Sequence, residues 1–243
     1  MVKERIDVVL AKRGMAESRE KAKILVMAGE VFIENKRILK SDLKVPFDAK
    51  IEIKADPIGY VSYGGVKLEK ALKESRIDIK GKKALDIGSS TGGFTDCLIK
   101  HGVAYVYALD VGTNQLHERL RQNKNVIVKE GINARYLTFE DIGEKVDIIT
   151  IDVSFISLKK ILPAALPLLS DNGIIISLVK PQFEVGRYKV GKGGIVKDEK
   201  KIEEVIEEIK RFGSDMGIKP KEVIEAPKDR QKKNREFFIV WER

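Results

Sequence analysis

Short apolar runs that alternate with helical segments dominate the chain beyond residue 82. The runs occupy residues 84–87, 106–109, 148–151 and 174–179, and two further strand candidates cover residues 222–226 and 236–241. Strands this apolar must be buried on both faces, which requires a largely parallel sheet with helices packed on either side. The pattern therefore predicts an α/β, Rossmann-like fold for this part of the chain.

The first 55 residues follow a different pattern. Apolar positions recur at helical spacing in residues 5–12 and 19–28, with Ser18 placed to cap the second helix and Gly29 placed to end it. Residues 31–33 then predict a strand that enters a turn at 35–37. We interpret residues 1–55 as a small α+β domain, residues 56–65 as a linker of turn formers and small residues, and residues 66–243 as the larger domain.

The charge of the chain restricts its partners. A formal net charge of +9 at pH 7 favours a polyanion, either a nucleic acid or an anionic membrane surface. No stretch approaches the roughly 18 apolar residues of a spanning helix, and the charged start lacks the apolar core of a signal peptide, so we expect a cytoplasmic protein. The single cysteine, Cys97, cannot form an internal disulfide, and the two histidines complete no metal-ligand set at a recognisable spacing. We expect Cys97 to be a buried structural thiol and the protein to need no metal.

A glycine-rich segment follows the first apolar run of the larger domain. Residues 86–95 read Asp-Ile-Gly-Ser-Ser-Thr-Gly-Gly-Phe-Thr, and Asp110 ends the next run 22 positions after Gly88. Glycines let a backbone pass close to a ligand, and an acidic residue at this distance binds a ribose hydroxyl in such folds. The segment lacks the Gly-Lys-Ser/Thr of a phosphate-binding loop and the Gly-x-Gly-x-x-Gly spacing of dinucleotide sites, so we expect a nucleoside cofactor without a pyrophosphate. A plain strand-to-helix turn would also account for the glycines alone.

Three stretches together resemble one known family. They are residues 60–68, the loop 86–95, and residues 180–187 running into 192–198. In this order they resemble the hemolysin A-type (TlyA) family, in which an S4-like RNA-binding domain precedes an FtsJ-like ribose 2′-O-methyltransferase domain. The resemblance implies a seven-stranded sheet with an antiparallel last strand, S-adenosylmethionine as cofactor, and methyl transfer to a ribose 2′-hydroxyl of ribosomal RNA, with cytidine as the expected nucleotide. Tyr63 departs from the family pattern, which usually has arginine there.

The resemblance also implies a catalytic tetrad of Lys67, Asp152, Lys180 and Glu236. Asp152 and Lys180 end predicted strands, Glu236 begins one that is antiparallel, and Lys67 precedes a helix, so the four can meet at one edge of the sheet. A neutral ribose hydroxyl is a poor nucleophile, so we expect Lys180 to accept its proton. Asp152 would orient Lys180 and meet the methyl-sulfonium end of the cofactor, while Lys67 and Glu236 would hold the ribose. Taken singly, each residue is better explained as a solvated cap of a strand or helix.

The remaining predicted sites concern the cofactor and the RNA. Cofactor contacts are predicted for Asp86, Gly88, Ser90, Gly92, Asp110 and Asn133, with Asn133 near the adenine. RNA contacts are predicted on the first two helices and on a second basic stretch just before Glu236, for Arg5, Lys12, Arg13, Ser18, Arg19, Lys21, Arg230, Lys232 and Lys233. A solvated helix face would carry the same charges.

Other functions remain as alternatives: a non-catalytic RNA-binding factor for ribosome assembly, a membrane-active protein, and a base-modifying methyltransferase. Membrane activity requires an apolar hairpin or a basic amphipathic helix, and the sequence has neither. Base methylation requires a catalytic cysteine or an Asn-Pro-Pro-Tyr-like motif after the fourth strand, where residues 152–155 read Asp-Val-Ser-Phe. We expect a monomer that acts on ribosomal RNA or a ribosomal subunit.

Overall fold

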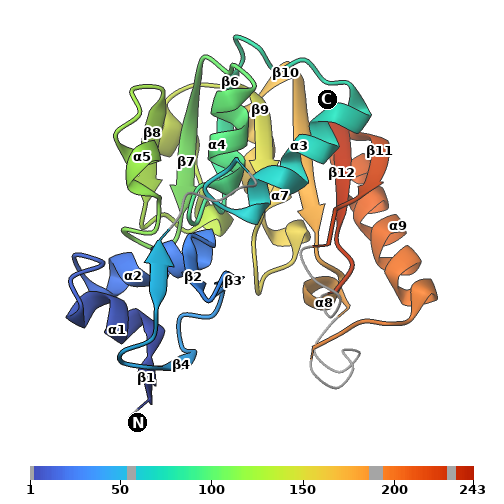
Figure 1. Ribbon diagram of the computed structural model, residues 1–243. Helices are drawn as coiled ribbons and strands as arrows, with labels where there is room; N and C mark the ends of the chain where they lie inside the picture. The colour runs from blue at the N-terminus through green and yellow to red at the C-terminus, as the bar shows by residue number, and fades with distance from the viewer. Residues whose placement is uncertain (1–2, 54–58, 186–193, 229–233) are drawn as a thin grey trace.

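The computed structural model describes residues 3–53, 59–185, 194–228 and 234–243. A small N-terminal unit lies beside a larger α/β unit (Figure 1). The elements of the N-terminal unit are β1 (Lys3–Arg5), α1 (Ile6–Lys12), α2 (Arg19–Ala28), β2 (Val31–Ile33), β3 (Lys36–Arg37), β4 (Lys44–Pro46) and β5 (Ile51–Ile53).

The N-terminal unit has the two helices and the strand that its sequence pattern predicts, but the turn lies at residues 34–35 and Lys36–Arg37 form β3. The apolar faces of α1 and α2 close on a core that includes Ile6, Leu10 and Val26, and β2 pairs antiparallel with both β3 and β5. The hydroxyl of Ser18 accepts a hydrogen bond from the backbone N–H of Lys21 at 3.1 Å, which caps α2 as expected. Gly29 ends the helix in the left-handed conformation, with φ at +78°.

The larger unit contains the elements that form the sheet and its covering helices. They are α3 (Tyr63–Ser75), β6 (Lys83–Ile87), α4 (Gly93–Lys100), β7 (Tyr105–Asp110), α5 (Glu118–Arg121), β8 (Val126–Glu130), η1 (Ala134–Tyr136), α6 (Phe139–Ile142), β9 (Val146–Ile151), η2 (Leu158–Lys160), α7 (Leu162–Ala165), η3 (Leu166–Leu168), β10 (Leu169–Val179), α8 (Pro181–Glu184), α9 (Glu199–Asp215), β11 (Lys219–Glu225) and β12 (Phe237–Glu242).

Seven of these strands form one sheet in the order β11-β12-β10-β9-β6-β7-β8. Strands β6 to β10 run parallel to one another, whereas β12 is antiparallel to both of its neighbours. This arrangement confirms the predicted Rossmann-like sheet with an antiparallel last strand. The carboxyl ends of β7, β9 and β10 point toward the side on which the N-terminal unit lies (Figure 1).

Helices cover both faces of the sheet, as the apolar strands require. One core packs α3, α4 and α5 against the sheet through residues such as Leu68, Leu98 and Leu120. The other packs α7 and α9 against the opposite face through residues such as Leu162 and Ile209. Cys97 is fully buried in the first of these cores, so it is the structural thiol that was predicted. Burial raises the pKa of its thiol to about 12.

The chain enters the larger unit before α3 begins. Tyr60 and Val61 are buried in the core under α3 and α4, and the backbone N–H of Val61 donates to the carboxylate of Asp96 at 2.9 Å. The final part of the segment predicted as a linker therefore packs as part of the larger unit, whereas residues 56–58 lie outside the described residues. Among the helices described, none has the length and apolar character needed to cross a membrane.

Candidate active site

A cavity of about 250 Å³ opens at the carboxyl edge of the sheet. Its walls come from the glycine loop after β6, the first turn of α3 and the residues that end β9 and β10. The lining residues are Ser62, Tyr63, Gly64, Lys67, Gly88, Ser89, Ser90, Thr91, Gly93, Phe94, Asp152, Ser154 and Lys180. Three of the four predicted catalytic residues and two of the six predicted cofactor residues, Gly88 and Ser90, are among them.

The glycine loop can take its path only because two positions lack a side chain. Gly88 has φ at +86°, and a Cβ there would lie 2.3 Å from the backbone oxygen of Asp152. Gly92 has φ at +97°, and a Cβ there would lie 2.3 Å from a methyl carbon of Leu120. The first glycine thus allows close approach of β6 and β9 at the cavity, whereas Gly92 allows close packing of α5 behind the loop.

Asp86 lies under the cavity and does not line it. Its carboxylate is fully buried and accepts hydrogen bonds from the hydroxyls of Thr95 at 2.6 Å and Thr150 at 2.9 Å. Burial is the main cause that raises the pKa of this carboxyl to about 7, against the lowering effect of the two threonines. Asp86 therefore ties β6 to α4 and β9 from below.

Asp110 and Asn133 lie at the neighbouring strand end, outside the cavity walls. The carboxylate of Asp110 accepts the N–H of Ser90 and the N–H of Gly112, both at 2.8 Å, so it joins the glycine loop to the loop after β7. Asn133 is exposed and caps a short helix by accepting the N–H of Arg135 at 3.1 Å. Its neighbour Ile132 donates to the backbone oxygen of Asp110 at 3.1 Å, which keeps Asn133 close to this strand end.

Lys180 and Asp152 form an ion pair on one wall of the cavity. The Nζ of Lys180 lies 2.5 Å from Oδ1 of Asp152 and donates to the hydroxyl of Ser154 at 3.0 Å. The backbone N–H of Asp152 donates to the oxygen of Ile87 at 2.9 Å, so the strands themselves set the position of the carboxylate. The lysine side chain is only 11% exposed and is among those that line the cavity.

Lys67, which lines the same cavity, forms a second ion pair with Glu236. The Nζ of Lys67, on α3, lies 2.5 Å from Oε2 of Glu236, which immediately precedes β12. Each side chain is 17% exposed. Tyr63, in the first turn of α3, donates its hydroxyl to the backbone oxygen of Lys228 at 3.0 Å. The structure therefore brings together all four residues of the predicted tetrad as two lysine–carboxylate pairs.

Phe155 is a feature of the site that the sequence analysis missed. It is 90% exposed and has φ at +65°, a conformation that an L-residue with a large side chain rarely adopts. Its ring centroid lies 5.0 Å from that of Phe183 on α8. This ring contact connects the segment after Asp152 with the segment after Lys180. In the sequence, the available signal was an aromatic residue directly after Asp152-Val153-Ser154. Only the backbone angle of the folded chain distinguishes it from an ordinary loop residue.

The basic residues of the N-terminal unit are held by local partners. The fully buried carboxylate of Asp7 accepts from Arg5 and Arg19, each at 3.0 Å, and these bonds keep its pKa below the usual value although burial acts to raise it. Arg13 donates to the backbone oxygen of Ala49 at 2.7 Å, and Lys12 pairs with Glu4 at 2.7 Å. Arg5 and Arg19 keep part of their guanidinium surface in solvent. The predicted RNA contacts Arg230, Lys232 and Lys233 lie outside the described residues.

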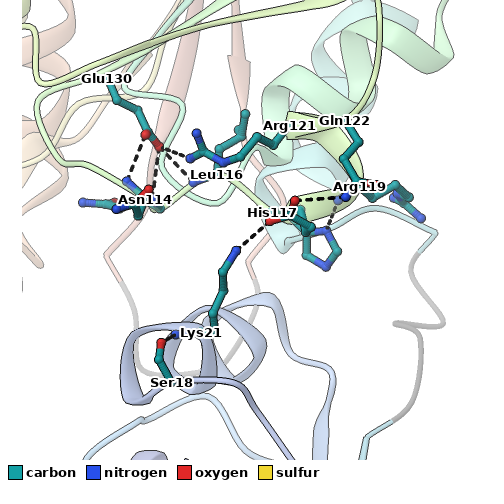
Figure 2. A network of polar contacts seen from close by, with 11 residues as sticks. Ser18, Lys21, Asn114, Leu116, His117, Arg119, Arg121, Gln122 and Glu130 are labelled. Atoms are coloured by element: carbon teal, nitrogen blue, oxygen red, sulfur yellow. Dashed lines mark hydrogen bonds and ion pairs between the residues drawn. The ribbon is translucent and has the colours of Figure 1, made fainter.

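Lys21 has a different environment from the other predicted RNA contacts. Its amine pairs at 2.6 Å with Glu118 on α5 of the larger unit. Figure 2 shows the side chain of Lys21 reaching from the N-terminal unit toward the segment that carries His117. A second polar contact, between Nε2 of His117 and a carboxylate oxygen of Glu30 at 3.3 Å, joins the two units beside it. The hydroxyl of Ser18 is occupied by its helix cap. Ser18 thus contributes to the structure of the N-terminal unit, and Lys21 to the contact of that unit with the larger unit.

Comparisons with known proteins place the chain in a family. A model of the FtsJ-like methyltransferase family matches residues 60–243, and a model of the S4 domain matches residues 4–51. YqxC of Bacillus subtilis, named as an rRNA methyltransferase, is 49% identical over 216 residues, which cover 88% of this chain and 77% of the relative. The 16S/23S rRNA (cytidine-2′-O)-methyltransferase TlyA of Mycobacterium tuberculosis is 39% identical over 236 residues, which cover 97% of this chain and 88% of the relative.

A solved structure gives the same result for the fold. A Streptococcus thermophilus protein that carries the name hemolysin aligns with a TM-score of 0.77 and 42% identity, over 100% of this chain and 89% of that one. These similarities cover both units and agree with the resemblance seen in the sequence motifs. The chain therefore belongs to the FtsJ-like methyltransferase family and carries an S4 domain in front of its methyltransferase domain.

Proposed function

We propose that this protein transfers a methyl group from S-adenosylmethionine to a ribose 2′-hydroxyl of ribosomal RNA, with cytidine as the target nucleotide. The observation that carries the proposal is the convergence of Lys180–Asp152 and Lys67–Glu236 on one cavity beside the glycine loop. Relatives of similar length whose names specify rRNA cytidine-2′-O-methylation support the choice of substrate. Residues 1–55 would bind RNA and residues 66–243 would carry out catalysis, with 56–65 joining them.

Lys180 is the proton acceptor in this proposal. A 2′-hydroxyl that attacks a methyl carbon must lose its proton as the new C–O bond forms and the C–S bond breaks. The Nζ of Lys180 stands on the cavity wall, oriented by Asp152 and Ser154, and in its neutral amine form, in which it donates hydrogen bonds to these two residues, its lone pair can take that proton from a hydroxyl in the cavity. Lys67, which lines the cavity, and its partner Glu236 would donate to and accept from the hydroxyls of the same ribose. Positioning of this kind accounts for a large part of enzymatic rate enhancement.

The residues around the glycine loop fit the cofactor. S-adenosylmethionine, when bound, supplies an electrophilic methyl group on a sulfonium. Residues 88–91 line the cavity, and Gly88 has no side chain that could obstruct it. The carboxylate of Asp110 stands at the next strand end, where it can bind ribose hydroxyls. Asp152 would face the methyl-sulfonium end, and Asn133 the adenine.

Two further features would bind the RNA. Arg5 and Arg19 are held in place by Asp7 and keep donors directed to solvent, which suits contacts with phosphates. Phe155 offers an exposed ring beside the cavity on which the base of the target nucleotide can stack. Arg230, Lys232 and Lys233 would hold the RNA backbone next to Glu236. The protein would act as a monomer in the cytoplasm, and the reaction described requires no metal ion.

Methylation of purified ribosomal RNA or subunits with radiolabelled S-adenosylmethionine tests the proposal. We expect Lys180→Met and Lys180→Arg to lower the single-turnover rate about 100-fold or more, because a positioned base contributes about 10²–10⁴-fold and arginine cannot accept the proton. Alkaline hydrolysis then separates ribose from base methylation, because a methylated 2′-oxygen cannot attack its own phosphodiester and that linkage resists cleavage.

The matched control is Lys145→Met, which removes an exposed lysine that pairs with Asp171 far from the cavity. This control should methylate at the wild-type rate. Wild-type rates for both Lys180 variants would refute the catalytic assignment. A product that alkali cleaves at the methylated nucleotide would refute ribose methylation.

A further inference from the structure

The loop after β7 is held by one carboxylate that the proposed reaction does not use. Glu130 is the last residue of β8 and stands directly beside Asp110, the last residue of β7. Its two oxygens accept three consecutive backbone N–H groups, from Asn114 at 2.9 Å, Gln115 at 3.1 Å and Leu116 at 3.3 Å. Figure 2 shows this carboxylate facing the loop backbone, with the guanidinium of Arg121 beside it.

The geometry around Glu130 requires an anion. Successive N–H groups that converge on one point form a concave site of positive potential, and Asn114 has φ at +56°, as such a turn requires. Arg121 adds a charge-assisted bond at 2.7 Å, and the Glu130 side chain is only 11% exposed. Although burial acts to raise the pKa of Glu130, these donors outweigh it and keep the pKa below the usual value.

Three further hydrogen bonds tie the same loop to Asp110, to Gly131 and to the glycine loop. Gly112 donates to Asp110, Gly131 donates to the oxygen of Gly112 at 3.2 Å, and the N–H of His117 donates to the oxygen of Thr91 in the glycine loop at 3.1 Å. The backbone conformation of residues 111–117 is therefore fixed by hydrogen bonds to Asp110, to the carboxylate of Glu130 and to the glycine loop. A change in that path moves the surface that a nucleoside bound at Asp110 would contact.

We propose that Glu130 is a positioning residue for the cofactor: it holds residues 114–116 so that the loop after Asp110 keeps the shape that receives the nucleoside end of S-adenosylmethionine. This inference rests on the proposed function, since it presumes that the nucleoside binds at Asp110. Glu130 acts through the loop backbone and touches neither the methyl group nor the RNA. Its loss therefore weakens cofactor binding and leaves the chemical step intact.

Titration calorimetry with S-adenosylmethionine and S-adenosylhomocysteine tests this with the full-length Glu130→Gln protein. We expect Kd to rise about 10-fold to 100-fold, the effect of losing a hydrogen bond to a charged group. KM for the cofactor should rise by the same factor, while kcat at saturating cofactor and KM for RNA stay within about twofold of wild type. Hydrogen exchange should accelerate at the amides of residues 114–116, and this readout applies even if the variant is less stable overall.

The matched control is Glu118→Gln, four residues after Asn114, which weakens the contact between the units at Lys21 but leaves the loop N–H groups bonded. It should bind the cofactor like wild type. Wild-type Kd for Glu130→Gln, or an equal loss in Glu118→Gln, would overturn the positioning role. Failure of the wild-type protein itself to bind S-adenosylmethionine would instead overturn the proposed function, and this inference with it.

Discussion

Phe155 offers a test that separates stability from activity. Its backbone is in the left-handed region at φ +65°, which costs a non-glycine residue about 1–2 kcal/mol. Since the side chain is 90% exposed, it gains little from burial, and its ring contact with Phe183 is worth about 0.5–1.5 kcal/mol. The folded state thus gains little or nothing from this residue.

Replacement of Phe155 by glycine should therefore leave the free energy of unfolding within about 1 kcal/mol of wild type. Glycine removes the φ penalty and the ring contact together, and its greater freedom in the unfolded chain costs about 0.5–1 kcal/mol. Phe155→Ala keeps the φ penalty and loses the ring contact, so this variant should be the less stable of the two. Urea unfolding of the three proteins measures both differences.

Activity on RNA should fall in both variants, whatever their stability. Stacking of a base on an aromatic ring is worth about 1–3 kcal/mol, which corresponds to roughly a 5-fold to 150-fold loss in kcat/KM for RNA in both Phe155→Gly and Phe155→Ala. The affinity for S-adenosylmethionine should not change, and Phe155→Trp, which keeps a stacking surface, should retain most of the activity. If Phe155→Gly methylates RNA with the wild-type kcat/KM, or if activity follows stability across the series, the assignment of Phe155 to base stacking is refuted.

Two further changes test the framework beneath the cavity. The folded-state pKa of Asp86 is raised to about 7 from an ordinary value near 3.8, so its contribution to the free energy of unfolding is full below pH 3.8 and is lost as pH rises toward 7. Urea unfolding between pH 4.5 and 7.5 should therefore show a stability that falls with pH, and Asp86→Asn should remove that fall. The same dependence on pH in the variant would contradict the assignment. Gly88→Ala should lower methylation far more than the control Gly81→Ala. Both glycines have positive φ, but only a Cβ at Gly88 would meet the backbone oxygen of Asp152. Equal activity in the two variants would show that this close approach is unimportant.

Much of the fold could be predicted because its information is local. The apolar runs that became β6, β7, β9 and β10 must be buried wherever they lie, and the glycines of residues 88–93 are needed for a turn within a few residues. The arrangement of the sheet was implied by the family resemblance, and it brings the ends of β9 and β10 and the start of the antiparallel β12 to one edge. The meeting of Lys67, Asp152, Lys180 and Glu236 was predicted from the same resemblance, and their catalytic roles remain predictions.

Other features were decided only by the tertiary structure. The contact of Asp86 with the cofactor stays a prediction, and the tertiary structure adds the two threonines from separate elements that donate to its buried carboxylate. The contact of Lys21 with RNA stays a prediction, and only the docking of the two units shows its ion pair with Glu118. The strained angle of Phe155 and the three N–H groups held by Glu130 depend on loops whose paths are set by distant neighbours. Periodicity along a chain determines which residues are buried in strands and helices, whereas the partner of a polar side chain depends on segments far away in the sequence that only the folded chain brings within hydrogen-bonding distance.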